Sequence, residues 1–359
     1  MALAIPIGLS GWCLVLGAVW GFAVSAGILY NVGMGQIANK HGCVNRDKVD
    51  LWKQDISESV DFYNRWFLSF APQTFKAART RSAKDVANTF KLVNDCMNLD
   101  ADMLLLVPQI LPILRQMTCP PLARDRLAGL AGISPAVVKR FELGAQVAGW
   151  PTKNAPESAQ KIIRVINRLI DSDLLPWLNV AGSVPTAEQR ERAALVIADR
   201  LCGALADPIL RNSQEKRQLE SIEKFLRDLG YHKVTPKSHM EMKPGEFAFH
   251  LNIRVALEDN TEPAVNIPVD VAIQRKSAQV GTLPIIIEAK SAGDFANVNK
   301  RRKEEAQKIT QLKRTYGNAV EFLLFLCGYF DSGYLGYEAA EGIDWIWEHR
   351  ISDMEKLCL

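Results

Sequence analysis

The stretch Leu283-Pro-Ile-Ile-Ile-Glu-Ala-Lys290 decides the fold prediction, together with Ile267-Pro-Val-Asp-Val-Ala-Ile273 upstream. Each stretch is a short apolar run rich in β-branched residues, which is typical of a buried strand. If the two strands are neighbours, Asp270 and Glu288 meet at one edge of a sheet. Lys290 points to the same face as Glu288, because side chains in a strand repeat every second residue. Two carboxylates so placed suit Mg²⁺, which retains water ligands for a phosphate.

These three side chains predict a site that hydrolyses a phosphodiester. A phosphodiester is anionic, so attack by hydroxide needs a metal ion that neutralises the developing charge and lowers the pKa of bound water. We assign Asp270 and Glu288 as ligands of Mg²⁺, for which we expect Mn²⁺ to substitute. Lys290 is assigned to orienting the nucleophilic water and stabilising the transition state. The alternative, a purely structural ion pair between Glu288 and Lys290, is less favoured because buried strands rarely end in unpaired charges.

The elements around these strands resemble the PD-(D/E)xK nuclease superfamily. The sequence predicts a helix over residues 214–230, strands over 247–257, 265–274 and 283–290, a helix over 294–316, and a strand over 320–327. The resemblance implies an α+β fold with a mixed-sheet, restriction-endonuclease-like core and a large α-helical N-terminal domain. Val269 separates Pro268 from Asp270, so the Pro-Asp pair of the motif is not literal. An upstream helical glutamate often joins such sites, and Glu220 is the candidate metal ligand, with Glu223 behind it.

The N-terminal region is apolar. Residues 1–39 carry no charge, and residues 9–32 are long and apolar enough to span a bilayer. This segment is either transmembrane-like or an over-extended start; the charged region of a signal peptide is missing. Because a membrane anchor suits a DNA-cutting enzyme poorly and Met34 offers an internal start, we expect an over-extended reading frame and no membrane partner. The remaining chain is divided into a helical domain at 40–210 and a nuclease domain at 211–359.

Residues 122–143 of the helical domain resemble a helix-turn-helix. Gly132 is predicted to form the turn, and Ser134 to cap the second helix. Ser134, Lys139 and Arg140 would then lie where a recognition helix meets DNA. An ordinary tight helical hairpin remains the alternative, since helix pairs with short glycine turns are common.

Composition limits the remaining functions. With 359 residues, 48% hydrophobic and 23% charged, the chain is globular and can bury a sizeable core. The net charge is only +3, so affinity for nucleic acid must come from local clusters. Seven cysteines without a Cys-x-x-Cys pattern predict reduced thiols in the cytoplasm and no structural zinc.

The strongest basic cluster lies one turn past the acidic site, where it would meet DNA phosphates, and comprises Lys300, Arg301, Arg302 and Lys303.

Two stretches narrow the resemblance to the XamI-type restriction endonucleases: Ser59-Val-Asp-Phe-Tyr-Asn-Arg-Trp-Phe67 and the core that begins at Glu288-Ala-Lys290. The resemblance covers about residues 47–350. It implies a type II restriction endonuclease that cuts double-stranded DNA at a short palindrome, resembling GTCGAC, as a homodimer paired with a cognate DNA methyltransferase. A palindrome is met most simply by a two-fold dimer.

Two other functions stay open from the sequence. One is an Mrr-like or repair endonuclease without strict site readout. The other is a non-enzymatic DNA-binding protein built on the helix-turn-helix. Intact Asp270, Glu288 and Lys290 argue against this second alternative, because a regulator has no need of a metal site.

Overall fold

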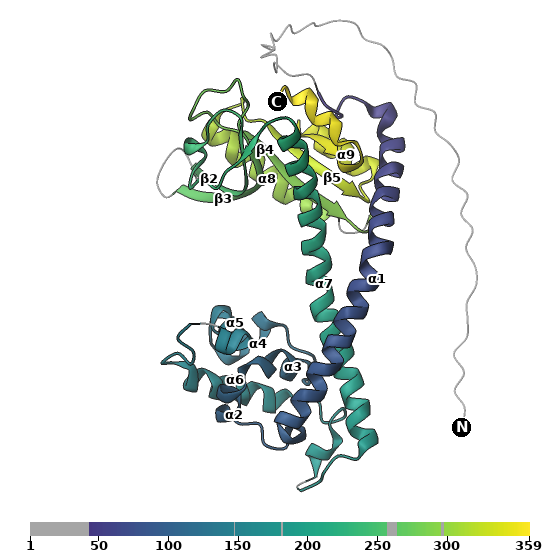
Figure 1. Cartoon of the computed structure of the whole chain (residues 1–359), viewed down its shortest axis with the longest axis vertical. Helices are drawn as coiled ribbons and strands as arrows, with labels where there is room; N and C mark the ends of the chain where they lie inside the picture. The colour runs from purple at the N-terminus through teal and green to yellow at the C-terminus, as the bar shows by residue number, and fades with distance from the viewer. Residues whose placement is uncertain (1–42, 147, 181, 257–263, 296–297) are drawn as a thin grey trace, which may run out of the picture. The chain divides into compact units, whose positions relative to one another are not determined.

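The computed structural model describes residues 43–359 apart from 147, 181, 257–263 and 296–297 (Figure 1). One compact unit covers His41–Leu359. The apolar segment 1–39, with Met34, lies outside the described residues. Among the residues that are described, no helix has the length and apolar character needed to cross a membrane. The six cysteines within the described ranges are all free thiols.

Two long helices connect the parts of this unit. α1 (Trp52–Leu92) and α7 (Ala187–Asp228) pack against each other and contribute to more than one hydrophobic cluster (Figure 1). Pro72 lies inside α1, and Pro208 lies inside α7. A proline removes one helical hydrogen bond, and here small side chains of α1 and α7 pack together in a separate cluster that includes Ala78 and Ala206. The predicted boundary between residues 210 and 211 therefore lies within α7, and no linker separates the two parts.

The helical part surrounds its own core. Its remaining helices are α2 (Ala101–Leu106), α3 (Leu111–Gln116), α4 (Arg124–Ala131), α5 (Pro135–Leu143) and α6 (Ala155–Leu169). Phe90 of α1, Leu114 of α3, Ile162 of α6 and Ile197 of α7 all lie in this core. Pro108 begins a 3₁₀ turn that separates α2 from α3.

The C-terminal part is built on a six-stranded mixed sheet in the order β1-β2-β3-β4-β5-β6. β2 to β4 form an antiparallel meander, whereas β1 is parallel to β2, and β4, β5 and β6 are mutually parallel. α8 (Val298–Tyr316) connects β4 to β5, and α9 (Ser332–Ala340) connects β5 to β6. The strands are β1 (His232–Lys233), β2 (Glu246–Ala256), β3 (Ala264–Ile273), β4 (Ile285–Ala292), β5 (Phe322–Gly328) and β6 (Asp344–Trp347).

The described part of the chain also contains short 3₁₀ helices: η1 (Val49–Leu51), η2 (Asn94–Cys96), η3 (Pro108–Ile110), η4 (Gly144–Gln146), η5 (Pro176–Asn179), η6 (His239–Glu241) and η7 (Glu348–Leu357).

Helices cover both faces of the sheet, and the side chains of β5 contact helices on each face. Leu324 and Leu326 belong to the cluster that contains Leu312 of α8 and Leu335 of α9. The alternate residues Leu323 and Phe325 belong to the cluster formed with α7. Because successive side chains of a strand point to opposite faces, helices cover the sheet on two sides. The predicted α+β fold, with a mixed sheet and a large helical N-terminal region, is confirmed.

Candidate active site

Asp270 and Glu288 lie where the pairing between β3 and β4 stops. The last paired residues are Val271 and Ile287, and one further step of this antiparallel register places Asp270 opposite Glu288. Asp270 Oδ2 accepts a hydrogen bond of 2.9 Å from the backbone N–H of Ala289. At this point a hydrogen bond to a side chain replaces the backbone hydrogen bonds between the strands. The two carboxylates lie on neighbouring strands, as the sequence indicated.

Glu288 is a buried carboxylate held by two lysines. Its side chain is 3% exposed, and its Oε1 accepts a hydrogen bond of 2.8 Å from Lys308 Nζ. Its Oε2 lies 3.5 Å from Lys290 Nζ. Burial raises the pKa of Glu288, and the nearby charge of Asp270 raises it further, while Lys290 and Lys308 act in the opposite direction. The carboxylate is therefore kept in a low-dielectric site in which its charge depends on cations close by.

Lys290 lies within reach of a second buried carboxylate, which the sequence reasoning missed. Lys290 Nζ is 3.6 Å from Glu305 Oε1, and the Glu305 side chain is 2% exposed. Tyr334 donates its hydroxyl to Glu305 Oε2 at 3.0 Å. Burial raises the pKa of Glu305, and Lys290 opposes this shift. Glu305 precedes the buried Ile309 of α8 by four residues and so lies on the same helical face. Helical spacing indicates that face, but nothing in the sequence places Glu305 beside Lys290.

A third carboxylate reaches Asp270 from α7. Candidate ligand atoms of Glu215, His250 and Asp270 all lie within 4.8 Å of one another. His250 lies opposite Asp270, at a position where the ladder between β2 and β3 forms no bridge, and its backbone φ is +52°. Such a left-handed conformation is uncommon in a non-glycine residue. These donors suit a divalent cation: carboxylate oxygens fit Mg²⁺, and an added imidazole also suits transition-metal ions.

Glu220 and Glu223, the glutamates expected from α7, are placed elsewhere. The Glu220 side chain is 64% exposed and lies 3.6 Å from Lys216. Glu223 pairs with Arg227 and Lys233. Five residues separate Glu220 from Glu215, a rotation of about 140° at 3.6 residues per turn. The structure therefore brings Glu215, and not Glu220, to Asp270.

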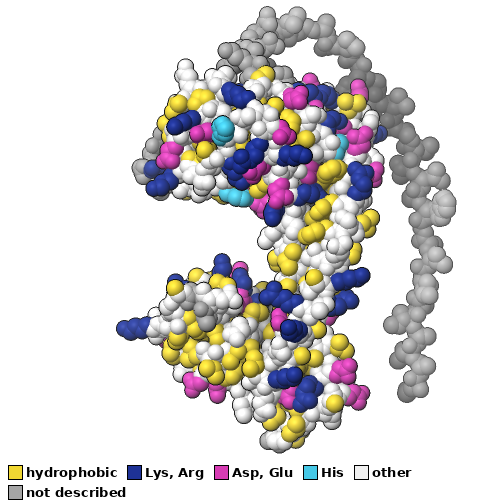
Figure 2. All heavy atoms as spheres, viewed as in Figure 1, with side chains coloured by type: hydrophobic (Ala, Val, Ile, Leu, Met, Phe, Trp, Pro, Cys, Tyr) yellow, Lys and Arg dark blue, Asp and Glu magenta, His cyan; other side chains and the backbone are white. Residues whose placement is uncertain are grey.

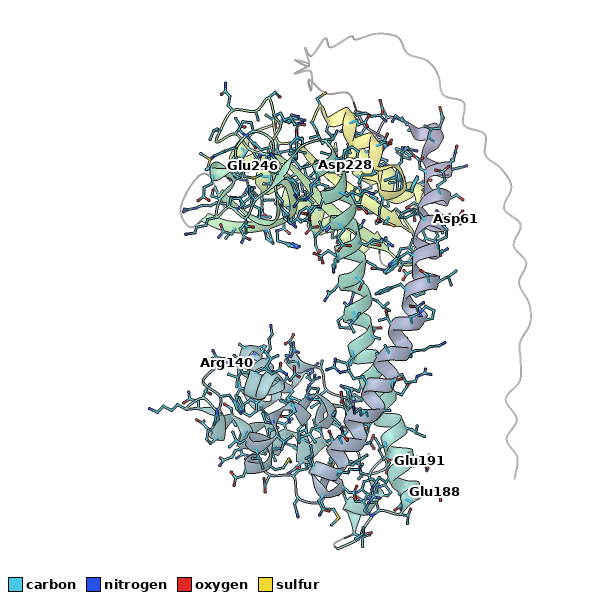
Figure 3. All side chains as sticks on the ribbon, viewed as in Figure 1. Asp61, Arg140, Glu188, Glu191, Asp228 and Glu246 are labelled. Carbon is cyan, nitrogen blue, oxygen red and sulfur yellow. The ribbon has the colours of Figure 1, made fainter. Side chains whose placement is uncertain are left out.

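The predicted helix-turn-helix is present as two short helices, α4 and α5. Gly132 ends α4 with a φ of +63°, a conformation that suits glycine. Ser134 occupies the N-cap position of α5, but its side chain makes no capping hydrogen bond, contrary to expectation. Ser134, Lys139 and Arg140 are all exposed, and Figure 3 shows Arg140 at the surface of the helical part. The DNA contacts expected of them stay a prediction.

The basic cluster begins α8. The backbones of Lys300, Arg301 and Arg302 are helical, whereas their side chains lie outside the described residues; Lys303 is exposed. On the face drawn in Figure 2, Lys and Arg side chains are interspersed with Asp and Glu. This distribution agrees with the small net charge and leaves any phosphate binding to local groups of cations.

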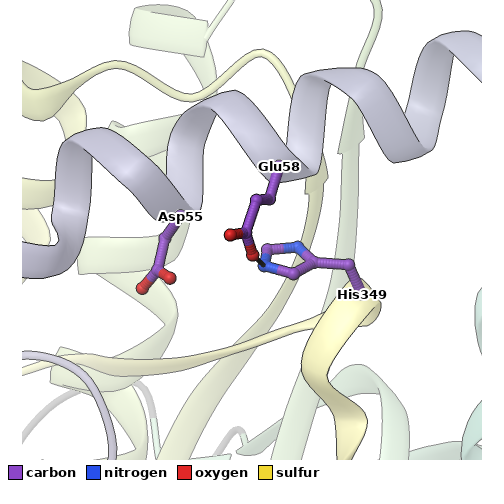
Figure 4. A group of neighbouring side chains, drawn as sticks. All are labelled: Asp55, Glu58 and His349. Atoms are coloured by element: carbon purple, nitrogen blue, oxygen red, sulfur yellow. Dashed lines mark ion pairs between the residues drawn. The ribbon is translucent and has the colours of Figure 1, made fainter.

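A second group of possible ligands, formed by Asp55, Glu58 and His349, serves another purpose (Figure 4). His349 Nε2 lies 3.4 Å from Glu58 Oε2, and burial lowers the pKa of His349. Both oxygens of Asp55 accept hydrogen bonds from the guanidinium of Arg350, one of them at 2.8 Å. A guanidinium in this position opposes a metal cation, so we assign this group to anchoring α1 against η7.

A mixed sheet covered by helices, with Asp270, Glu288 and Lys290 at the end of its central hairpin, defines a restriction-endonuclease-like nuclease. Comparison with known proteins identifies the family: residues 94–347 match the XamI restriction endonuclease family. Type II restriction enzyme SalI from Streptomyces albus G is 45% identical over 315 residues, which are 87% of this chain and 98% of that enzyme. Type II restriction enzyme XamI from Xanthomonas campestris pv. amaranthicola is 32% identical over 121 residues, 33% of this chain and 39% of XamI. The chain belongs to the XamI restriction endonuclease family.

The expected class is thereby confirmed: the protein is a type II restriction endonuclease, a site-specific deoxyribonuclease, and enzymes of this class use a divalent metal ion. The Mrr-like nuclease and the non-enzymatic regulator are correspondingly disfavoured. A solved structure of protein VC1899 from Vibrio cholerae aligns with 73% of this chain and 56% of its own, at 13% identity and a TM-score of 0.27. A likeness this low supports no argument.

Proposed function

We propose that this enzyme cleaves double-stranded DNA at a short palindromic site by Mg²⁺-dependent hydrolysis at Asp270, Glu288 and Lys290. The observation that carries the proposal is the end of the β3–β4 ladder. There the register puts two carboxylates opposite each other, and Lys290 Nζ lies 3.5 Å from Glu288 Oε2. Two carboxylates can hold the metal ion, and the lysine can orient water, so these groups suit hydrolysis of an anionic diester.

Each residue has one role in this proposal. Asp270 and Glu288 hold Mg²⁺, and Glu215 takes the part that had been expected for Glu220. The bound ion supplies charge neutralisation at the phosphate and a lowered pKa of coordinated water. Lys290 orients the attacking water and donates a hydrogen bond to the negative charge that develops on the phosphate. His250, whose Nδ1 lies 3.9 Å from Glu215 Oε1, lies beside this site, and its imidazole favours Mn²⁺ as a substitute ion.

DNA is held by two further groups of residues in this proposal. Ser134, Lys139 and Arg140 on α5 contact base edges, and Lys300, Arg301, Arg302 and Lys303 at the start of α8 contact phosphates. We further propose that the enzyme acts as a homodimer, because a palindrome presents the same half-site twice. A cognate methyltransferase protects host DNA in the same compartment, the cytoplasm.

A direct test is digestion of duplex oligonucleotides by the purified full chain. One duplex carries GTCGAC, the site that the family resemblance implies, and a matched duplex carries the same bases in a non-palindromic order. We expect discrete products from the first duplex with Mg²⁺ or Mn²⁺, none with excess EDTA, and no cleavage of the second. Random nicking of both duplexes would contradict the proposal. If only a mapped plasmid is cut, at another discrete site, the proposed sequence is wrong and the enzyme class stands.

A further inference from the structure

α8 sends one buried side chain, Glu305, and one half-buried side chain, Lys308, to the end of β4. Glu305 and Lys308 are three residues apart and therefore lie on one face of the helix. Glu305 Oε1 lies 3.6 Å from Lys290 Nζ, and Lys308 Nζ lies 2.8 Å from Glu288 Oε1. Each of the two residues thus contacts a different member of the Glu288–Lys290 pair.

Both side chains are fixed by a second contact. Tyr334 of α9 donates to Glu305 Oε2 at 3.0 Å, and Lys308 donates to the backbone carbonyl of Pro268 on β3 at 2.8 Å. Lys308 therefore bridges β3 and β4 at the place where their ladder has ended. In this way the orientation of the Glu288 carboxylate depends on a helix that follows it in the chain.

A purely structural role explains these contacts poorly. Burying charged groups costs more than burying apolar groups of similar size, and buried ion pairs can often be replaced by apolar residues without loss of stability. Here the neighbouring positions of the same face, Ile309 and Leu312, are apolar and buried. The two charged residues lie specifically beside Glu288 and Lys290, where orientation of a carboxylate and an ammonium group matters for reaction.

We propose that Glu305 and Lys308 are positioning residues for DNA cleavage, with Glu305 holding the ammonium group of Lys290 and Lys308 orienting the carboxylate of Glu288. The inference rests on the proposed roles of Glu288 and Lys290 in catalysis. It adds a second lysine and a second buried glutamate to the site, neither of which needs to touch DNA or the metal ion.

The test is single-turnover cleavage of a cognate duplex by the full-length enzyme with Mg²⁺. Glu305→Gln and Lys308→Met should each slow cleavage by about 10- to 100-fold, which is the loss that one hydrogen bond to a charged group corresponds to. The dissociation constant for DNA should stay unchanged. Lys308→Arg should recover part of the rate, and Glu304→Gln, on the exposed face of the same helix, serves as the matched control that cuts normally.

Double substitutions distinguish positioning from general damage to the fold. In long incubations with excess enzyme, which detect the residual rate of the Lys290→Met and Glu288→Gln backgrounds, Glu305→Gln should cause no further loss in the first background and Lys308→Met none in the second, because each acts through the residue already removed. Full additivity in both backgrounds would overturn the inference. If Glu305→Gln fails to fold, Tyr334→Phe, which removes one hydrogen bond of Glu305, should slow cleavage severalfold; a normal rate would count against the inference.

The proposed function fails in a different way. If Lys290→Met and Glu288→Gln themselves cut at the normal rate, the catalytic assignment is wrong. If these two variants retain only a small residual rate while Glu305→Gln and Lys308→Met cut normally, the assignment stands and only the positioning roles are lost.

Discussion

Ala289 donates its backbone N–H to the carboxylate of Asp270, across the point at which β3 and β4 cease to pair. The donor is the residue directly after Glu288, so the same short stretch of β4 supplies the Glu288 carboxylate and orients that of Asp270. Sites built on strands hold their side chains more precisely than sites built on loops. The hydrogen bond therefore sets the orientation of Asp270 by means of the sheet itself.

Substitution of Asp270 or Glu288 by alanine should abolish cleavage and largely spare DNA binding. Loss of one ligand removes transition-state stabilisation of several kcal/mol, or at least about 100-fold in rate, whereas phosphate contacts are made by other residues. Gel-shift and cleavage assays on the same preparations would separate the two effects. Cutting by Asp270→Ala at close to the normal rate would refute the site assignment.

Two glutamates of α7 allow a matched comparison. Glu215→Gln should lower the cleavage rate and raise the Mg²⁺ concentration needed for half-maximal activity, because Glu215 lies with His250 and Asp270. Glu220→Gln should leave both quantities unchanged, since its side chain is exposed and pairs with Lys216. The measurement is a Mg²⁺ titration of the cleavage rate. Equal behaviour of the two variants, or a defect only in Glu220→Gln, would exclude Glu215 as a ligand.

Separate roles are expected for the two basic groups that we propose contact DNA. Lys139→Ala with Arg140→Ala should relax or destroy site preference, because a good base-edge contact contributes about 1–3 kcal/mol of discrimination. Neutralising Lys300, Arg301 and Arg302 should weaken binding to all sequences and flatten its salt dependence. Binding to cognate and unrelated duplexes over a range of salt concentrations distinguishes these outcomes. A uniform loss in both variants would reduce α4 and α5 to a scaffold.

Acid should weaken the C-terminal ion-pair network around Asp353. Burial alone would raise the pKa of Asp353, but hydrogen bonds from Arg350, Lys356 and Asn45 outweigh it and lower the pKa from 3.8 to about 2. Because the folded pKa lies below the unfolded value, the stabilisation is complete above the unfolded pKa and is lost as the pH falls towards the folded value.

The contribution at neutral pH amounts to about 2 kcal/mol. Urea unfolding of the normal chain and of Asp353→Asn should therefore give a difference in unfolding free energy that shrinks by about 1 kcal/mol between about pH 6 and about pH 3. A difference that did not change with pH would show that the Asp353 charge contributes nothing to stability.

The strands of the site were predictable because their pattern is local. β3 and β4 begin and end within two residues of the ranges expected from their apolar runs, and their polar ends marked Asp270, Glu288 and Lys290. The short strand β6 went unpredicted. It contains only four residues, Asp344–Trp347, of which the last three are buried against β5, so neighbouring elements and not its own length make it a strand.

The two long helices each contain a proline. Pro72 and Pro208 are strong local signals for a helix end, yet α1 and α7 continue past both. Packing between the two helices outweighs a missing hydrogen bond in each, and this packing involves residues more than 100 positions apart. Such contacts have no local signature.

By itself, the sequence determined the nuclease class and the position of Asp270, Glu288 and Lys290 near the end of the β3–β4 ladder, because strand periodicity and buried charge are read from a few adjacent positions. Only the tertiary structure decided which distant groups join them. Glu215 comes from α7, His250 from β2, and Glu305 and Lys308 from α8. Each is an ordinary polar residue in its own helix or strand. Its approach to Asp270, Glu288 or Lys290 follows from how the helices cover the sheet, which depends on the packing of the whole core.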